Sequence, residues 1–330
     1  MSTYRNGNYL VTIDPDGTKL YTGLRRGEEF SPEFPDAIDI KLTNTCYHGC
    51  TFCHEDSGPE GKEGNLGELK QILSYLPQVP IELSFGGGNI LTIEKEKLID
   101  LFKWCKERGH KVGITLNYID WISFLSYGKN YTGLIDAVGV SVNTIGSEMN
   151  NREECLKLYN SHLNDWMDKV GIPVVYHFVL GTFSIDFLKS FLSEKKISIL
   201  GNGKSKFNFK RVLLLGYKLR GRGESKTYYP SSDYLEKLRT FLLQSSMSYG
   251  FNDLNIISLD NLAITQLRMK EAFTSEEWEE LYQGDDFTHS MYIDLPGRSY
   301  GPSSTSSTRI EFDNLKYKNN IVEYFKNEHN

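Results

Sequence analysis

The sequence predicts an α/β fold built on a parallel sheet. Between residues 37 and 217, apolar runs of strand length alternate with stretches whose apolar residues are spaced as in helices. Six strands separated by helices can be traced in this way. A repeated strand–helix–strand order is typical of parallel sheets with right-handed crossovers. Six strand–helix units are fewer than the eight that form a closed barrel. In parallel α/β folds, ligands bind at the C-terminal ends of the strands.

Composition and charge restrict the function classes. The 330 residues are 39% hydrophobic and 24% charged, as expected for one large globular domain or one domain with an appended element. A formal net charge of −6 gives no overall electrostatic reason to bind nucleic acid, although a local basic patch stays possible. No apolar run is long enough to span a bilayer, and the N-terminus lacks the apolar core of a signal peptide. We therefore expect a cytoplasmic protein without a membrane partner.

The N-terminal segment predicts a β-hairpin. Two strand-like runs at 8–13 and 19–21 flank the turn sequence Asp-Pro-Asp-Gly, in which Asp-Gly supplies the positive φ of a tight turn. We expect residues 1–35 to cap one end of the fold. The expected strands that follow are 37–42, 81–85, 111–116, 137–142, 173–180 and 209–217, and the expected helices are 68–76, 93–108, 121–126, 152–170 and 185–194.

The periodic pattern changes after about residue 230. A helix is predicted at 234–246, followed by a weakly periodic stretch to 284, a strand-like run at 291–295 and a Ser/Thr tract at 303–308. We therefore divide the chain into the N-terminal cap, an α/β unit at 36–229 and a C-terminal extension at 230–330 that covers the mouth of that unit.

Three cysteines with the spacing C-x3-C-x2-C follow the first predicted strand of this unit. Cys46, Cys50 and Cys53 lie in a loop rich in Thr, Asn and Gly. Three thiolates on one loop can hold three irons of a 4Fe-4S cluster and leave the fourth iron open. The alternative is a zinc site, for which His48 or His54 would be the fourth ligand.

The cysteine count excludes a secreted disulfide framework. Five cysteines is an odd number, and three of them are crowded into one loop. Cys105 and Cys155 lie in helix-like stretches, where we expect buried and unreactive thiols.

The cysteine spacing, with Phe52 just before the last cysteine, resembles the signature of the radical S-adenosylmethionine (radical SAM) superfamily. The resemblance covers residues 36 to about 223. It implies an open partial (β/α)6 barrel and a single 4Fe-4S cluster whose open iron binds the amino and carboxylate groups of SAM. It further implies that reductive cleavage of SAM gives a 5′-deoxyadenosyl radical, which abstracts hydrogen from a substrate. A low-potential electron donor such as flavodoxin or ferredoxin is implied as a partner.

A glycine-rich strand end supports this resemblance. Gly86, Gly87 and Gly88 end the second strand before Asn89, and they resemble the Gly-Gly-Glu segment whose backbone approaches the SAM amino group. A backbone that meets a ligand closely tolerates no Cβ atom. Asn89 departs from the family pattern, since an amide brings no charge. A plain strand-to-helix turn is the alternative interpretation.

Polar residues at other strand ends are further candidates. Ser141 and Asn143 fit the position that faces the SAM ribose or carboxylate, and alternation places both on one face of their strand. His177 lies inside the apolar fifth strand, where it either lines the substrate cavity or is a satisfied core histidine.

Charged residues near the cysteine loop and after the last strand complete the predicted site. His54 and Glu55 directly follow the loop and are candidate catalytic residues. Lys218 and Arg220 belong to a basic stretch at 204–226. Within it, the segment from Gly216 to Gly223 is similar to the sixth-strand loop that lies near the adenine and the SAM carboxylate in the family. A solvated lysine-rich loop is the alternative for this stretch.

The segment 290–303 has the outline of the hairpin that begins the auxiliary-cluster region of many peptide-modifying radical SAM enzymes, with serines where cysteines would stand. We therefore predict a single-cluster radical SAM enzyme that acts on a peptide or protein side chain. Two alternatives stay open: an enzyme that modifies a nucleotide or nucleic acid, and a non-catalytic module that binds zinc or an iron–sulfur cluster.

Overall fold

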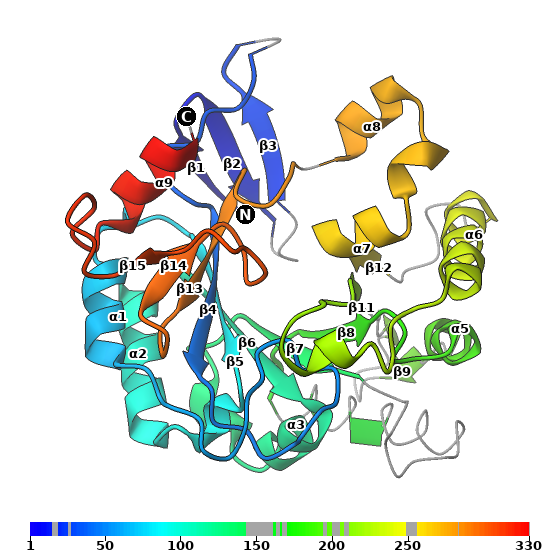
Figure 1. Ribbon diagram of the computed structural model, residues 1–330, viewed down its shortest axis with the longest axis horizontal. Helices are drawn as coiled ribbons and strands as arrows, with labels where there is room; N and C mark the ends of the chain where they lie inside the picture. Colours follow the sequence, from blue (N-terminus) through cyan, green and yellow to red (C-terminus); the bar gives the residue numbers. More distant parts are fainter. Residues whose placement is uncertain are drawn as a thin grey trace.

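The computed structural model describes residues 1–14, 19–25, 28–142, 161–162, 166, 170–193, 197–199, 205–207, 211–248, 256–282 and 284–329 (Figure 1). The predicted helix at 152–170, Asn143 and Cys155 lie largely or wholly outside these ranges. None of the described helices combines the length and the apolar character that crossing a membrane requires.

One large sheet organises the described part of the chain (Figure 1). Its strand order is β12-β11-β8-β7-β6-β5-β4-β13-β14-β15. All neighbouring pairs from β12 to β13 are parallel, and the last two pairs are antiparallel. The strands are β4 (Ala37–Thr43), β5 (Glu82–Gly87), β6 (Lys111–Asn117), β7 (Ala137–Ser141), β8 (Val174–Val179), β11 (Arg211–Leu215), β12 (Ile256–Leu259), β13 (Ser290–Asp294), β14 (Ser299–Gly301) and β15 (Ile310–Glu311).

The parallel α/β sheet is therefore confirmed, with two differences. The weakly periodic stretch contains β12, which adds a parallel strand beside β11, and β13 adds another beside β4. β12 has only four residues, too few to show a periodicity. The C-terminal extension thus contributes strands to both sides of the six predicted ones.

Helices cover one face of this sheet. Alternate strand positions such as Ile38, Ile40 and Leu42 are buried against them, and Phe85 of β5 contacts Phe102 of α2 with ring centroids 5.3 Å apart. The helices are α1 (Leu66–Leu73), α2 (Lys95–Glu107), α3 (Tyr118–Phe124), α5 (Ile185–Ser193), α6 (Ser232–Ser248), α7 (Asn261–Gln266), α8 (Ser275–Leu281) and α9 (Ile321–His329). Cys105 of α2 is fully buried, as expected.

Short elements connect these helices and strands. They are the 3-10 turns η1 (Ile90–Thr92), η2 (Gly128–Tyr131), η3 (Gly221–Ser225) and η4 (Met269–Ala272), and the antiparallel pair β9 (Ile197–Ile199) and β10 (Ser205–Phe207).

The opposite side of the strands, which we call the inner face, is formed by the positions that alternate with the buried ones. Asp39 is paired in register with Ser84, Ser84 with Gly113, and Gly113 with Ala137. A second row, nearer the C-terminal ends, contains Asn117, Ser141 and His177. Most of these side chains are partly or fully accessible to solvent, in contrast to the opposite face.

The N-terminal segment forms a three-stranded antiparallel sheet, β1 (Ser2–Asn6), β2 (Tyr9–Ile13) and β3 (Lys19–Gly23). The predicted hairpin is present, and β1 extends it through a turn at Gly7, which has φ +56°. Asp36, just before β4, binds this sheet by accepting hydrogen bonds from Tyr4 and Tyr9. In Figure 1 the small sheet lies at the end of β4 from which that strand starts, away from the cysteine loop.

Candidate cluster-binding site

The cysteine loop begins at the C-terminal end of β4. Cys46, Cys50 and Cys53 are free thiols of intermediate exposure. Burial is the largest influence on the pKa values of Cys46 and Cys50 and raises both, and the charges of the neighbouring thiols add to this effect. The start of the loop is fixed by hydrogen bonds from the Cys46 amide to the Gly58 carbonyl and from the Gly58 amide to the Asn44 carbonyl. The three thiols therefore share one stretch of ordered backbone.

Arg222 connects this loop to the segment after β11. Its Nε donates to the Cys50 carbonyl oxygen at 2.8 Å and its Nη2 to the Ser57 carbonyl oxygen at 2.9 Å. Its backbone amide donates to the Cys53 carbonyl oxygen, and its Nη1 pairs with Asp56 at 3.0 Å. The Arg222 side chain thus binds the loop at Cys50 and just after Cys53, and its positive charge partly opposes the rise that burial causes in the pKa of the Cys46 and Cys50 thiols.

Two glycines allow close backbone contacts in this segment, Gly221 with the cysteine loop and Gly223 with the segment itself. A Cβ atom at Gly221 would lie 2.8 Å from the Cys53 carbonyl oxygen, and Gly221 has φ +55°. A Cβ atom at Gly223 would lie 2.4 Å from the Lys218 carbonyl oxygen. Larger residues are excluded at both positions. The Gly-Arg-Gly sequence therefore has a structural reason here.

The predicted glycine-rich strand end contacts the same loop. Gly87 has φ +116°, and a Cβ atom there would lie 2.6 Å from the Thr43 carbonyl oxygen. A Cβ atom at Gly88 would lie 2.3 Å from the Thr45 carbonyl oxygen. Both glycines are thus required by the chain's own backbone. Gly86 differs, because a Cβ atom there would make only an ordinary contact with Thr115 Cβ at 3.7 Å, so the chain's own backbone does not require this glycine.

Asn89 is engaged inside the chain. Its Oδ1 accepts from the Leu91 amide and caps η1, while its Nδ2 donates to Asp120 Oδ1 at 3.0 Å. Asp120 Oδ2 in turn lies 2.5 Å from His48 Nε2. The hydrogen bond to Asp120 raises the pKa of His48. His48, a candidate zinc ligand in the sequence, is therefore oriented toward a carboxylate.

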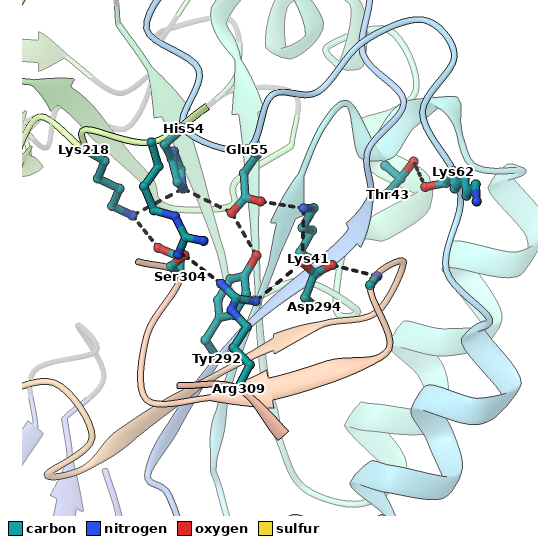
Figure 2. A network of polar contacts seen from close by, with 12 residues as sticks. Lys41, Thr43, His54, Glu55, Lys62, Lys218, Tyr292, Asp294, Ser304 and Arg309 are labelled. Atoms are coloured by element: carbon teal, nitrogen blue, oxygen red, sulfur yellow. Dashed lines mark hydrogen bonds and ion pairs between the residues drawn. The ribbon is translucent and has the colours of Figure 1, made fainter. Parts of the chain in front are cut away.

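The two residues after Cys53 join a buried ionic network (Figure 2). Lys41 of β4 pairs with Glu55 at 2.6 Å and with Asp294 of β13 at 3.3 Å. Tyr292 donates its hydroxyl hydrogen to Glu55 Oε1 at 2.8 Å, and His54 Nε2 lies 3.2 Å from the same oxygen. Burial alone would raise the pKa of Glu55, but His54 and Lys41 outweigh it and hold that pKa well below its usual range.

Lys218 and Arg220 bind the C-terminal extension. Lys218 Nζ donates to Ser304 Oγ at 2.7 Å and lies 3.5 Å from His54 Nε2. Arg220 Nη1 donates to the carbonyl oxygens of Ser304 and Ser306 at 3.2 and 3.1 Å. Together with Arg222, these cations of the basic stretch have partners within the chain and are not a free basic surface. Lys204 and Lys210 lie outside the described residues.

The remaining predicted residues lie in separate places. Phe52 contacts Tyr228 with ring centroids 6.3 Å apart. His177 is on the inner face, where Gly139 makes room for its ring, since a Cβ atom there would lie 2.4 Å from His177 Cε1. Burial lowers the pKa of His177 to about 4, so the ring is neutral near pH 7. Ser141 is its neighbour in register.

The donor set fits a 4Fe-4S cluster. Each of three thiolates binds its own iron in such a cluster, whereas a zinc ion needs all its ligands around one point. Among the described residues, no group of three or more His, Cys, Asp or Glu side chains is arranged to hold a single ion. The partly accessible thiols and the nearby Arg222 charge are compatible with a cluster at this loop.

Three residues that contribute to this site, Arg222, Asp120 and Tyr292, are not indicated as such by the sequence. Arg222 was noted only as part of a basic stretch, although its position between two glycines hinted at a close approach. Asp120 and Tyr292 reach the loop from α3 and β13, which are distant in sequence, and no local pattern signals either contact.

The fold is similar to those of two SAM-bound proteins. Streptococcus suis SuiB bound to S-adenosylmethionine matches with a TM-score of 0.55 and 17% identity, over 90% of this chain and 66% of that chain. Native anSMEcpe with bound AdoMet matches with a TM-score of 0.52 and 13% identity, over 88% of this chain and 82% of that chain. The chain therefore shares its fold with two proteins whose structures contain bound S-adenosylmethionine. It spans just under two thirds of the length of SuiB.

A further SuiB structure, bound to the precursor peptide SuiA, matches with a TM-score of 0.55 and 16% identity, over 90% of this chain and 65% of that chain. No protein-family model matches the sequence. No curated protein matches it either.

Proposed function

We propose that this protein is a radical SAM enzyme that modifies a peptide or protein side chain. The observation that carries the proposal is the position of Cys46, Cys50 and Cys53. They lie on one ordered loop at the C-terminal end of β4, beside the glycine-rich end of β5, in a fold shared with two SAM-bound proteins. Ligands of parallel α/β folds bind at this end of the strands.

The three cysteines would hold a single 4Fe-4S cluster, and the resident pair of cluster and SAM would supply reductive cleavage of SAM and hydrogen abstraction from the substrate. The chain's own residues would position the cluster and SAM and enclose the site. Arg222 orients the Cys50 and Cys53 carbonyls and adds positive charge beside the thiolates. Ser141 presents a polar side chain at the end of β7, and Asn143, outside the described residues, follows it.

The loop at 302–309 would limit the access of water to the site. Lys218 and Arg220 hold this loop at Ser304 and Ser306, close to His54. Exclusion of water matters because a reactive intermediate is otherwise lost in side reactions. We infer that the strands curve as an open partial barrel, with this loop at the mouth.

A peptide substrate is favoured by the SuiB structure that contains the precursor peptide SuiA. The alternative nucleic-acid function has less support, since Lys218, Arg220 and Arg222 all contact the chain itself. A low-potential donor, flavodoxin or ferredoxin, would deliver the electron.

Anaerobic reconstitution with iron and sulfide, followed by chromatographic assay of 5′-deoxyadenosine in the presence of SAM and dithionite, tests the proposal. We expect the unmodified chain to take up iron and to form 5′-deoxyadenosine. In Cys50→Ala both the iron content and the amount of 5′-deoxyadenosine should be lower. Cys105→Ala is the matched control, because Cys105 is buried in α2 away from the loop. Binding of zinc alone, without SAM cleavage, would support the non-catalytic alternative and reject ours.

A further inference from the structure

Asp39 differs from other carboxylates near the inner face in having no partner among the residues that the structure describes. Glu82 pairs with Lys19 at 2.8 Å, and Asp260 accepts hydrogen bonds from two backbone amides. Glu55 pairs with Lys41. In the part of the chain that the structure describes, the Asp39 side chain makes no hydrogen bond or ion pair, although it lies in the middle of a central strand.

Small residues lie beside Asp39 on the inner face. Across the strands, its row continues with Ser84, Gly113 and Ala137. On the other side Tyr292 of β13 is its neighbour in register, but the Tyr292 hydroxyl is directed to Glu55. No large side chain therefore occupies the row next to the carboxylate across three strands.

The surroundings of Asp39 disfavour an unpaired charge. The side chain is exposed to water, yet the mass of protein around it raises its pKa to about 6, chiefly by burial. Lys218 and Lys19 partly oppose this effect, and the charges of Glu82 and Asp286 add to it. Water thus reaches a carboxylate that lies deep in the fold, which is the situation of a group at the base of an open space.

A ligand that displaces this water must replace its interactions with the carboxylate. An ionised group that loses its water without gaining a partner is strongly destabilised. His177, on the same face, is neutral near pH 7 and so provides no countercharge. Lys218 is already held by Ser304. A ligand with a positive charge meets the requirement best, because it both donates hydrogen bonds to the carboxylate and neutralises its charge, whereas an anionic ligand does neither.

We propose that Asp39 is a substrate-binding residue that pairs with the cation of a lysine or arginine side chain in the peptide substrate. The inference rests on the proposed function for the peptide class of the substrate. Ammonium and guanidinium groups both form charge-assisted hydrogen bonds to a carboxylate. The row of Ser84, Gly113 and Ala137 gives room for the unbranched methylene chain that both side chains have.

Calorimetric titration of the anaerobically reconstituted full chain tests the inference. The probes are blocked tripeptides, acetyl-Gly-X-Gly-amide, with lysine, arginine, norleucine, citrulline or glutamate at X. We expect at least one cationic peptide to bind at least about tenfold more tightly than its neutral isostere, norleucine for lysine and citrulline for arginine; tenfold corresponds to ~1.4 kcal/mol. The two isostere pairs separate an ammonium from a guanidinium preference.

Asp39→Asn should abolish this preference while leaving the affinity for norleucine or citrulline peptide unchanged. Asp39→Lys should shift the preference to the glutamate peptide. Asp100→Asn removes the same charge from the exposed side of α2 and should change nothing. The comparison of peptides on the unmodified chain needs no variant, so it stands even where a substitution impairs folding.

Equal affinities for cationic and neutral peptides, a preference that survives in Asp39→Asn, or no measurable binding of either cationic peptide would each overturn the inference. Formation of 5′-deoxyadenosine is measured separately on the same preparation. SAM cleavage without cation preference rejects only the role of Asp39. Cation preference without SAM cleavage rejects only the proposed function.

Discussion

Two charged residues of β4, Lys41 and Asp39, have opposite environments although they are neighbours on the inner face. Lys41 is 5% exposed and pairs with Glu55 and Asp294. Asp39 is exposed to water and has no partner among the described residues. The chain neutralises its own charges where the cysteine loop has to be held, and it leaves a charge unpaired where we place the substrate.

The largest effect on stability is expected for Lys41→Met, which removes the cation that pairs with Glu55 and Asp294. Two neighbouring carboxylates, Glu55 and Asp294, would then lose their shared cation inside the protein. Removal of one partner from a buried pair typically costs about 3–5 kcal/mol, and urea unfolding measures this loss. The control is Lys237→Met, because the Lys237–Asp233 pair is exposed and such pairs contribute roughly 0–1 kcal/mol. Equal stability losses in the two variants would contradict the account.

Arg222→Ala is expected to have the next largest effect, on the cysteine loop. It removes hydrogen bonds to Cys50 and Ser57 and an ion pair with Asp56, and hydrogen bonds to charged groups are worth about 1.5–3 kcal/mol each. We expect a clear fall in iron and sulfide content after anaerobic reconstitution, with partial recovery in Arg222→Lys. Arg25→Ala, a change at an exposed arginine, is the control. Full cluster content in Arg222→Ala would show that the arginine does not hold the loop for the cluster.

Asp39→Asn is expected to have a smaller effect, and one of opposite sign. Because the pKa of Asp39 is raised to about 6 in the fold, the folded state binds more protons than the unfolded state between about pH 4 and 6. Its contribution to stability therefore falls as pH rises through this window and is unfavourable above pH 6. At pH 7.5 the variant should have a slightly higher melting temperature than the unmodified chain. The corresponding gain in the free energy of unfolding should be less than ~1 kcal/mol, because solvent screens the group. At pH 4 the difference should disappear, and a lower melting temperature at pH 7.5 would contradict the unpaired state.

The smallest effect is expected for Arg220→Ala at the loop over the site. The guanidinium binds the carbonyls of Ser304 and Ser306 and is partly exposed, so we expect a global loss of only about 0.5–1.5 kcal/mol. Amide hydrogen exchange at residues 304–308 should accelerate, while the core strand β5 stays protected. Unchanged exchange in the loop would show that Arg220 does not order it.

The sequence predicted β4, β5, β6, β7, β8 and β11 well, because each is a run of apolar residues bounded by glycine, proline or polar turns, whereas the short pair β9 and β10 was not predicted. β12 was missed, since four residues carry too little pattern. The pairing of β13 with β4 was also missed, since the two strands are about 250 residues apart and the sequence of neither strand indicates its pairing partner. Sheet order depends on tertiary contacts that no local pattern encodes.

For the site, the sequence located the loop but not the residues that hold it. The cysteines and the glycine-rich strand end follow from local spacing. Lys218 and Arg220 were expected to face SAM, and the structure shows them bound to Ser304 and Ser306, which lie about 85 residues later. Asp39 was not singled out, because only its exposure and its lack of a partner distinguish it from other acidic strand residues.

The most direct test of the proposed function is the electron paramagnetic resonance spectrum of the reduced, reconstituted protein, recorded with and without SAM. If Cys46, Cys50 and Cys53 are the three thiolate ligands, as we propose, one iron of the cluster would stay open to SAM. The account predicts a 4Fe-4S signal whose shape changes when SAM is added and which is lost in Cys50→Ala. A signal that SAM leaves unchanged, or a protein that takes up no iron, would contradict it.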